Sequence, residues 1–506
     1  MKPIAQAIAL LLLANSAQAA TSFSSSWFAA KGAAQAAGPA SPSAPRPGTP
    51  PPLAQQQRVQ QQLGRSLANM NSTVAAIAAS QAAQAAGRAA SFAAPQTIHN
   101  GLGGNGLNVV VGPDGKPLFV NADGPVQTDA NGKVLVSIKQ TADKAILNWD
   151  TFNIGRDTTL AFQQDANWAA LNKVNNSTAP SQIQGQIKAD GTVMILNSNG
   201  VVFSGSSQVN VRNLVAAATD FSDEQFKSGG LYNGNAPSFT NAQGAIRVEQ
   251  GAQLNTTAPS SSTTGGGYVL LLGKSVDNAG TISTPRGQTV LAAGDSFTIK
   301  KGYGTDGNLT STTRGNEVTA NLSDGTGAGL VNNSGLILAA SGDVTLTGNK
   351  VQQNGVALTS TSAETRGSLH LTARGSDASV TLGEGSTTAI LLDASATALD
   401  SQRDSLLAPA VAQDGKVIAA DTYRRDLSLV QIDSAGSVDF QKGSITLATG
   451  GQVAVHAGTR SLVRDGAVID VSGATGVRWP WSPTASRSTS RATSSATPLA
   501  TVMKAS

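Results

Sequence analysis

Two stretches of 14 residues decide the fold: residues 278–291 read NAGTISTPRGQTVL and residues 333–346 read NSGLILAASGDVTL. In both, the glycine at the third position is followed two residues later by isoleucine and seven residues later by a second glycine. Threonine or valine stands nine residues after the first glycine, and leucine stands eleven residues after it. Each stretch therefore reads as a short strand, a tight turn and a second short strand.

The same spacing recurs in full from Gly436. Gly244 and Gly466 share the aliphatic residue and the second glycine, and Gly200 lacks the second glycine. From Gly244 onwards these origins lie 36, 55, 101 and 30 residues apart, which argues against the fixed blades of a propeller. A solenoid with excursions of variable length accommodates such spacing. We therefore predict an all-β chain that folds as a parallel β-helix, with small aliphatic side chains stacked in a narrow interior. A string of β-sandwiches is the competing fold, but aromatic residues, which sandwich cores favour, make up only 4% of the chain.

The composition of the 506-residue chain excludes several classes of protein. The chain has no cysteine, which excludes disulfides, thiolate metal sites and cysteine nucleophiles. Its three histidines lie far apart in the sequence and leave little for a histidine metal site or a catalytic triad. The net charge of +4 comes from residues 477–506, so the rest of the chain is neutral. A neutral body lacks the basic surface that nucleic acids require, and we predict no nucleic-acid partner.

The amino terminus has the pattern of a secretory signal peptide over residues 1–19. Lys2 supplies the positive charge, residues 4–13 are apolar, and Ala17-Gln18-Ala19 is a small-x-small cleavage site. A buried core helix is the alternative interpretation of this run. The run is shorter than the roughly 20 residues that a membrane helix needs, and no later stretch is long and apolar enough. The sequence therefore predicts a protein that leaves the cytosol and does not span a membrane.

Residues 20–95 form a low-complexity segment. Up to residue 52 it consists mainly of Ala, Ser, Gly and Pro, which is typical of a linker. Over residues 53–90 apolar side chains recur at steps of three and four residues and predict an amphipathic helix. These apolar residues are Val59, Leu63, Leu67, Met70, Val74 and Ile77. Such a helix either binds a partner or another helix, packs on its own domain, or remains a semi-ordered spacer.

Three further stretches resemble segments of the filamentous haemagglutinin-type exoproteins. Residues 146–155, ILNWDTFNIG, are similar to the NW-x-SFNIG segment of that family. Residues 180–185, PSQIQG, and residues 197–203, NSNGVVF, are similar to its PSQI-x-G and NPNG-hydrophobic-x-F segments. Ser198 stands where proline is usual in the family. The motifs occur in the family's order, and the resemblance covers residues 97–300.

The resemblance implies a two-partner secretion (haemagglutination activity) domain over residues 96–325, followed by β-helix repeats over residues 326–476. Such exoproteins cross the inner membrane of a Gram-negative bacterium by the Sec route. Their amino-terminal domain then engages the periplasmic POTRA domains of a cognate outer-membrane β-barrel transporter. The chain threads out unfolded and folds outside the cell into a right-handed β-helix. A solenoid suits this route because it can add coils one after another.

The candidate transporter-recognition residues lie within these motifs. Asn197, Asn199 and Gly200 form either a docking element for the transporter or a corner that requires turn-forming residues. The other candidates act either in recognition or structurally, with aromatic rings that cap the first coils and asparagines that bond the backbone. They are Asn148, Trp149, Phe152 and Asn153.

No residue is predicted to be catalytic or to bind a metal or a cofactor. Asp123, Asp129 and Asn131 are close in sequence but lack the spacing of a calcium loop, and turns are the favoured interpretation. The chain contains no G-x-S-x-G, Walker or H-E-x-x-H motif.

We predict a secreted, haemagglutinin-like adhesin whose receptor is a host-cell glycan or protein. Solenoid faces rich in Ser, Thr and Asn would supply a broad polar contact surface. One alternative is the amino-terminal part of a contact-dependent toxin exoprotein. Another is a polysaccharide-acting β-helix enzyme, which would require a groove with clustered Asp or Glu. Residues 477–506 show no strand pattern and are predicted to be a disordered tail, either natural or out of frame.

Overall fold

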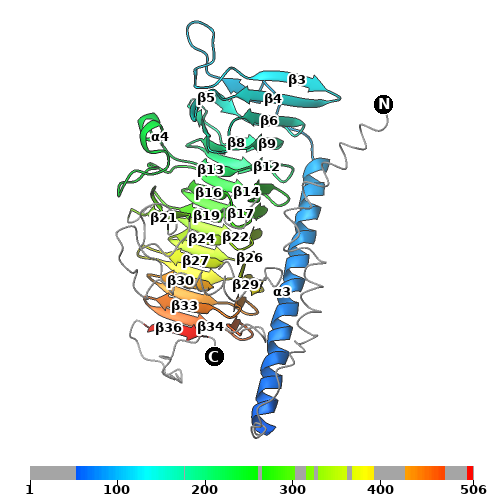
Figure 1. Cartoon of the computed structure of the whole chain (residues 1–506), viewed down its shortest axis with the longest axis vertical. Coiled ribbons are helices and arrows are strands. Elements are labelled where there is room, and N and C mark those ends of the chain that lie inside the picture. Colours follow the sequence, from blue (N-terminus) through cyan, green and yellow to red (C-terminus); the bar gives the residue numbers. More distant parts are fainter. Residues whose placement is uncertain are drawn as a thin grey trace, which may run out of the picture.

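A computed structural model of the chain describes residues 53–175, 177–259, 265–302, 315–323, 329–361, 367–392, 428–472 and 499–504. Three sheets of 13, 9 and 12 strands run along one stack, and we call them the first, second and third sheets. From residue 192 onwards the chain visits the first, then the second, then the third sheet, and one such circuit is one coil. Neighbouring strands from successive coils are parallel, so the chain folds as the predicted parallel β-helix (Figure 1).

The strand bounds follow this circuit. The first sheet consists of β1 (Leu107–Val109), β2 (Phe119–Val120), β5 (Lys144–Phe152), β7 (Ala169–Val174), β10 (Thr192–Leu196), β13 (Asn213–Ala217), β16 (Tyr268–Gly273), β19 (Gln288–Ala293), β24 (Asp343–Gly348), β27 (Ser368–Ala373), β30 (Leu429–Ser434), β33 (Gln452–Ala457) and β36 (Leu499–Lys504). The second sheet consists of β8 (Ser181–Ile183), β11 (Gly200–Phe203), β14 (Ala245–Val248), β17 (Ser275–Asn278), β22 (Leu330–Asn333), β25 (Lys350–Gln353), β28 (Ser379–Leu382), β31 (Ser437–Phe440) and β34 (Arg460–Val463). The third sheet consists of β3 (Val126–Ala130), β4 (Lys133–Lys139), β6 (Thr158–Gln163), β9 (Gln186–Ala189), β12 (Gln208–Val211), β15 (Gln253–Thr256), β18 (Thr281–Ser283), β23 (Leu336–Ala339), β26 (Val356–Thr361), β29 (Thr387–Leu392), β32 (Ile445–Ala448) and β35 (Val468–Asp470).

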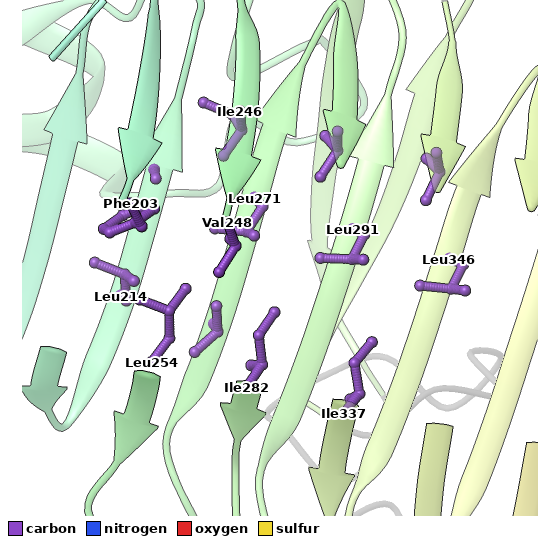
Figure 2. Packing of buried hydrophobic residues seen from close by; sticks show 14 of the residues in the cluster. Phe203, Leu214, Ile246, Val248, Leu254, Leu271, Ile282, Leu291, Ile337 and Leu346 are labelled. Carbon is purple, nitrogen blue, oxygen red and sulfur yellow. The ribbon is translucent and has the colours of Figure 1, made fainter. Parts of the chain in front are cut away.

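The interior is a set of aliphatic columns that run across the coils. Leu291 of β19 lies in register with Leu346 of β24, and Ile282 of β18 lies in register with Ile337 of β23. All four side chains are buried, and Figure 2 shows them in line along the stack. These residues occupy the repeat positions quoted from the sequence, so equivalent positions of successive units stack on one another. This continuous stacking excludes the competing string of β-sandwiches.

The glycines of the repeat also stand in columns, at corners where one coil passes very close to the next. A Cβ atom on Gly335 would lie 2.2 Å from the carbonyl oxygen of Gly280, and one on Gly342 would lie 2.3 Å from that of Gly287. The φ angle of neither Gly335 nor Gly342 is positive. These glycines are therefore required for clearance between backbones.

A ladder of buried amides runs along the end of the second sheet. The Asn278 Nδ2 atom donates to Asn333 Oδ1 at 2.7 Å, and the Asn333 Nδ2 atom donates to Gln353 Oε1 at 2.7 Å. All three side chains are fully buried. The ladder satisfies polar groups that would otherwise be costly to bury, and it links three successive coils.

The outer face of the first sheet is also apolar and is covered by two excursions from the solenoid. One excursion carries the short helix α4 (Asp223–Gly229), and the other is the antiparallel hairpin of β20 (Ser296–Lys301) and β21 (Asn316–Asn321). Their aromatic residues Phe226, Phe239 and Phe297 pack over Leu270 and Val290 of the sheet. These excursions account for part of the irregular spacing between the sequence units.

A long helix, α3 (Leu53–Ala93), lies lengthwise along the stack (Figure 1). Its buried side chain Ile77 packs against Leu336, Leu358 and Leu391 on the outer face of the third sheet. The apolar stripe predicted for residues 53–90 thus belongs to a helix that packs on its own domain.

The carboxyl-terminal end requires one correction. The described residues 499–504, which fall within the predicted disordered tail, form β36, which pairs with β33 in the antiparallel direction. Residues 499–503, LATVM, are an apolar run with β-branched residues, and β33 offers a free edge to such a run. Residues 477–498 lie outside the described residues, as do the predicted signal peptide and the linker over residues 20–52.

Candidate functional site

The three motif stretches meet at one corner of the first coils. Ile154, from the first stretch, forms a parallel bridge with Ile183 of β8, which belongs to the second stretch. β8 in turn pairs in parallel with β11, in the third stretch, where Gln182 lies in register with Val202. Segments that lie up to about fifty residues apart in the sequence therefore lie side by side, and we call them together the motif corner (residues 153–155, 181–185 and 197–203).

Asn197 organises the turn of the third stretch. Its backbone carbonyl accepts from the Gly200 N–H at 2.8 Å, and its Oδ1 atom accepts from the Asn199 N–H at 3.0 Å. Its Nδ2 atom reaches the preceding coil, where it donates to the Ala179 carbonyl at 3.0 Å and to Ser181 Oγ at 3.1 Å. The Asn197 side chain is buried, and its amide therefore acts inside the corner.

Asn199 and Gly200 complete this turn. The Asn199 Nδ2 atom donates to the Ser177 carbonyl of the preceding coil at 2.6 Å. Gly200 has a φ of 118°, and a Cβ atom there would lie 2.4 Å from the carbonyl oxygen of Ala245 in the next coil. Only glycine fits this position, since both the backbone angle and the close approach exclude a side chain.

Asn148 and Asn153 bond neighbouring backbone, as the structural interpretation predicts. The Asn148 Nδ2 atom donates to the Leu118 carbonyl at 2.7 Å, and the Asn153 Nδ2 atom donates to the Asn105 carbonyl at 2.8 Å. The Asn153 Oδ1 atom also accepts from the Gln182 N–H at 2.7 Å. The strands β1 to β4 and the residues just before them form a cap at the amino-terminal end of the stack (residues 105–139). Asn153 thereby joins this cap to the motif corner.

Trp149 and Phe152 are fully buried in the first coils. The ring centroid of Trp149 lies 5.3 Å from that of Phe119 and 5.3 Å from that of Phe152. The Trp149 Nε1–H group donates to Asn172 Oδ1 at 3.1 Å, and the Asn172 Nδ2 atom donates to the Met194 carbonyl at 3.0 Å. The sequence did not single out Asn172; its place directly after the apolar residues 169–171, AAL, is the signal that could have marked it as a buried polar residue.

The cap in front of these coils exposes several large apolar side chains. Asn131, with a φ of 52°, and Gly132 form the tight turn between β3 and β4, so the turn interpretation is correct for Asn131. It is wrong for Asp129, which lies within β3 and pairs with Val134 of β4. The exposed side chains come from this hairpin and from the residues just before it. They are Val111, Leu118, Val120, Val126 and Leu135, and each is more than 40% exposed.

In the part of the chain that the structure describes, no three His, Asp or Glu side chains gather closely enough to hold a metal ion. No helix in the same residues combines the length and the apolar character needed to cross a bilayer.

The fold and the motif corner define the chain as a β-solenoid protein, a parallel β-helix whose first coils carry a cap. The family model of the TPS secretion domain matches residues 110–374, more than half of the chain, so the chain belongs to this family. It is thus an exoprotein whose amino-terminal domain directs export by two-partner secretion. Members of the family are secreted or surface-exposed proteins of Gram-negative bacteria, and the family is not one of enzymes. The match crosses residue 325 without a break, and so do the three sheets.

Curated relatives and a solved structure are similar to parts of the chain. A heme/hemopexin-binding protein of Haemophilus influenzae strain Rd is 31% identical over 213 residues, which cover 42% of this chain and 21% of that protein. Another heme/hemopexin-binding protein of Haemophilus influenzae is 40% identical over 86 residues, 17% of this chain and 9% of that protein. The matched segments thus span only about a fifth of the first relative and about a tenth of the second. The crystal structure of the HMW1 secretion domain from Haemophilus influenzae superposes with a TM-score of 0.48 at 18% identity, over 73% of this chain and 84% of that one.

Proposed function

We propose that the motif corner is recognised by the POTRA domains of a cognate outer-membrane β-barrel transporter, and that the solenoid then folds outside the cell as an adhesin. The observation that carries the proposal is the meeting of all three motif stretches at the start of an uninterrupted stack of coils. The asparagine amides of this corner bond the protein itself. Recognition therefore uses the outer side of the corner, where Ser198 and Asn199 are half-buried.

Export is expected to depend on both the transporter and this outer side. When the chain is expressed with a cognate barrel transporter, the protein should appear in the medium, and without the transporter it should not. Ser198→Arg adds a bulky charge outside the turn and should reduce release at least about tenfold, which corresponds to 1.4 kcal/mol of binding. Immunoblots of medium and cells measure the released fraction.

The matched control is Thr381→Arg, which places the same side chain at a half-buried site of β28 in the same sheet, far from the corner. It should be released as the unchanged protein is. Thermal unfolding of both purified variants separates a loss of recognition from a loss of folding. Equal release with and without the transporter would defeat the two-partner route, and equal release of the two variants would defeat the role of the corner.

We propose that the outer face of the second sheet contacts the receptor. In the described residues, excursions cover the outer face of the first sheet, and α3 covers part of the third. The outer face of the second sheet instead carries a polar row in which each residue lies in register with the next. This row comprises Arg247, Asp277, Asn332, Gln352, Thr381 and Asp439. A flat row of hydrogen-bonding groups fits a glycan or a polar protein surface.

Adhesion is expected to be visible as agglutination of erythrocytes by the purified protein. The variant Asn332→Leu with Gln352→Leu removes two adjacent groups of the polar row and should raise the agglutinating concentration about tenfold or more. Treatment of the cells with glycosidase or with protease distinguishes a glycan receptor from a protein receptor. Unchanged agglutination by the double variant would show that the outer face of the second sheet is not the contact surface. Hydrolysis of the glycan would favour an enzyme instead.

A further inference from the structure

Helix α3 contacts successive coils along the solenoid. Near its carboxyl-terminal end, the Arg88 Nη1 atom donates to the carbonyls of Ser207 at 3.0 Å and Gly251 at 3.2 Å, in turns between the second and third sheets. Glycines on both sides allow this approach. A Cβ atom on Gly87 would lie 2.6 Å from Gln250 Cγ, and one on Gly251 would lie 2.3 Å from the backbone nitrogen of Arg88.

The helix advances along the stack in step with the coils. The Gln84 Nε2 atom, one helical turn before Arg88, donates to the Ala279 carbonyl at 2.7 Å, one coil further along the stack. Gln84 Oε1 accepts from the Gly251 N–H at 2.8 Å, so this side chain joins two coils. A helical turn rises about 5.4 Å and neighbouring strands lie about 4.8 Å apart, which makes the two repeats nearly equal.

The other end of α3 is bonded to the far end of the stack. The Asn69 Nδ2 atom donates to Asp470 Oδ2 at 2.9 Å, and the Ser66 Oγ atom donates to the same oxygen at 3.3 Å. From Arg88 to Asn69 the helix rises about 29 Å, and the six strand spacings from β15 to β35 also measure about 29 Å. The length of the helix between these contacts therefore matches the height of the stack from the turn before β15 to β35.

The Asp470 carboxylate is suited to this contact. Burial raises the pKa of Asp470, but hydrogen bonds from Ser472, Asn69 and Ser66 outweigh that effect and hold the pKa below its ordinary value. The group is therefore ionised at neutral pH, and its bonds to the helix are charge-assisted.

We propose that α3 is a strap that docks on the coils in the order in which they form and closes on Asp470 only when β35 has been wound. Asn69 and Asp470 are separated by 401 residues, so their contact requires nearly the whole described solenoid. A solenoid coil otherwise contacts only its neighbours, and its terminal coils fray readily. The strap couples the first coils to the last ones and protects the carboxyl-terminal end of the stack. This inference does not depend on the transporter.

The test compares two aspartate variants on the same helix in the full chain. Ile77→Asp places a charge in the apolar contact with the third sheet, whereas Ala78→Asp places it at an exposed position one residue away. Asn69→Ala is the milder third variant, which removes only the amide bond to Asp470. Trypsin cleavage after Arg65, followed by mass spectrometry, reports opening of the helix, and amide hydrogen exchange reports opening of β32 and β35.

Ile77→Asp and Asn69→Ala are expected to accelerate both cleavage after Arg65 and exchange in β35, at least about tenfold for Ile77→Asp. Exchange in β3 and β4, the first two strands of the third sheet, should remain unchanged and shows that the variants fold. Ala78→Asp should behave as the unchanged protein does. The strap is refuted if exchange in β35 is the same in all variants, or if Ala78→Asp opens the helix as much as Ile77→Asp does.

Discussion

Replacing Trp149 by alanine is expected to lower the free energy of opening of the first coils by about 3–5 kcal/mol, the usual cost of deleting a large buried aromatic side chain. Trp149 is fully buried and contacts two aromatic rings. Its loss also leaves Asn172, which is fully buried, without the indole donor. An unmet buried acceptor adds to the cost of the cavity.

Native-state hydrogen exchange in β5, β7 and β10 measures this effect, because these three strands carry the chain of bonds from Trp149 through Asn172 to Met194. Trp149→Phe keeps an aromatic ring and loses the donor, so it should cost less than alanine. Trp168→Ala, at a half-buried position just before β7, is the control and should cost little. A similar loss in Trp149→Ala and Trp168→Ala would contradict the role of Trp149 as a cap of the first coils.

The interior of the fold was predictable because it depends on local spacing. A coil places alternate residues of each short strand inward, and the distance between such residues is set by strand and turn lengths alone. Ile282 and Leu291 therefore stand at the same distances from Gly280 as Ile337 and Leu346 do from Gly335. Ile282 pairs in register with Ile337, and Leu291 pairs in register with Leu346.

The reason for the repeated glycines was not predictable from the sequence. A glycine in a turn is compatible both with a left-handed backbone and with close passage of another segment. Gly251 combines the two, with a φ of 96° and the helix beside it, whereas Gly335 has only the close passage. The distinction depends on the neighbouring coil, which the local sequence does not contain.

The covered outer faces were missed for a related reason. Residues 336–338 read LIL, and a run without alternation indicates a strand that is buried on both faces. That pattern shows that something covers the strand but does not identify the cover. The partner is α3, more than two hundred residues earlier in the chain, and its stripe alone left packing on the domain, partner binding and a spacer as alternatives.

The motif corner was likewise predictable only in part. The sequence placed Asn197, Asn199 and Gly200 in one turn, and the turn forms as predicted. It did not predict that Asn197 and Asn199 would bond the segment carrying the PSQI motif in the preceding coil, because that contact depends on the stacking of coils. The role of these residues in recognition by a transporter stays a prediction.

Gly287→Ala is expected to separate two neighbouring coils and to cost about 3 kcal/mol, the upper end of what overpacking usually costs. The new Cβ atom would lie 1.8 Å from the carbonyl oxygen of Gly267, where two atoms cannot both fit. That same oxygen accepts from the Gln288 N–H at 3.0 Å, so moving the coil away also breaks a ladder bond.

The effect of Gly287→Ala should concentrate on the two strands that meet at this corner, β16 and β19, because each coil depends on its neighbours. Hydrogen exchange of their amides should accelerate about a hundredfold, since each 1.4 kcal/mol corresponds to a factor of ten. Gly265→Ala is the matched control: it lies two residues before Gly267, has no atom within 4 Å of the added Cβ and has no positive φ. If both substitutions were tolerated equally, clearance between coils could not be the reason for the glycine, and the repeat would have to be explained by the turn conformation alone.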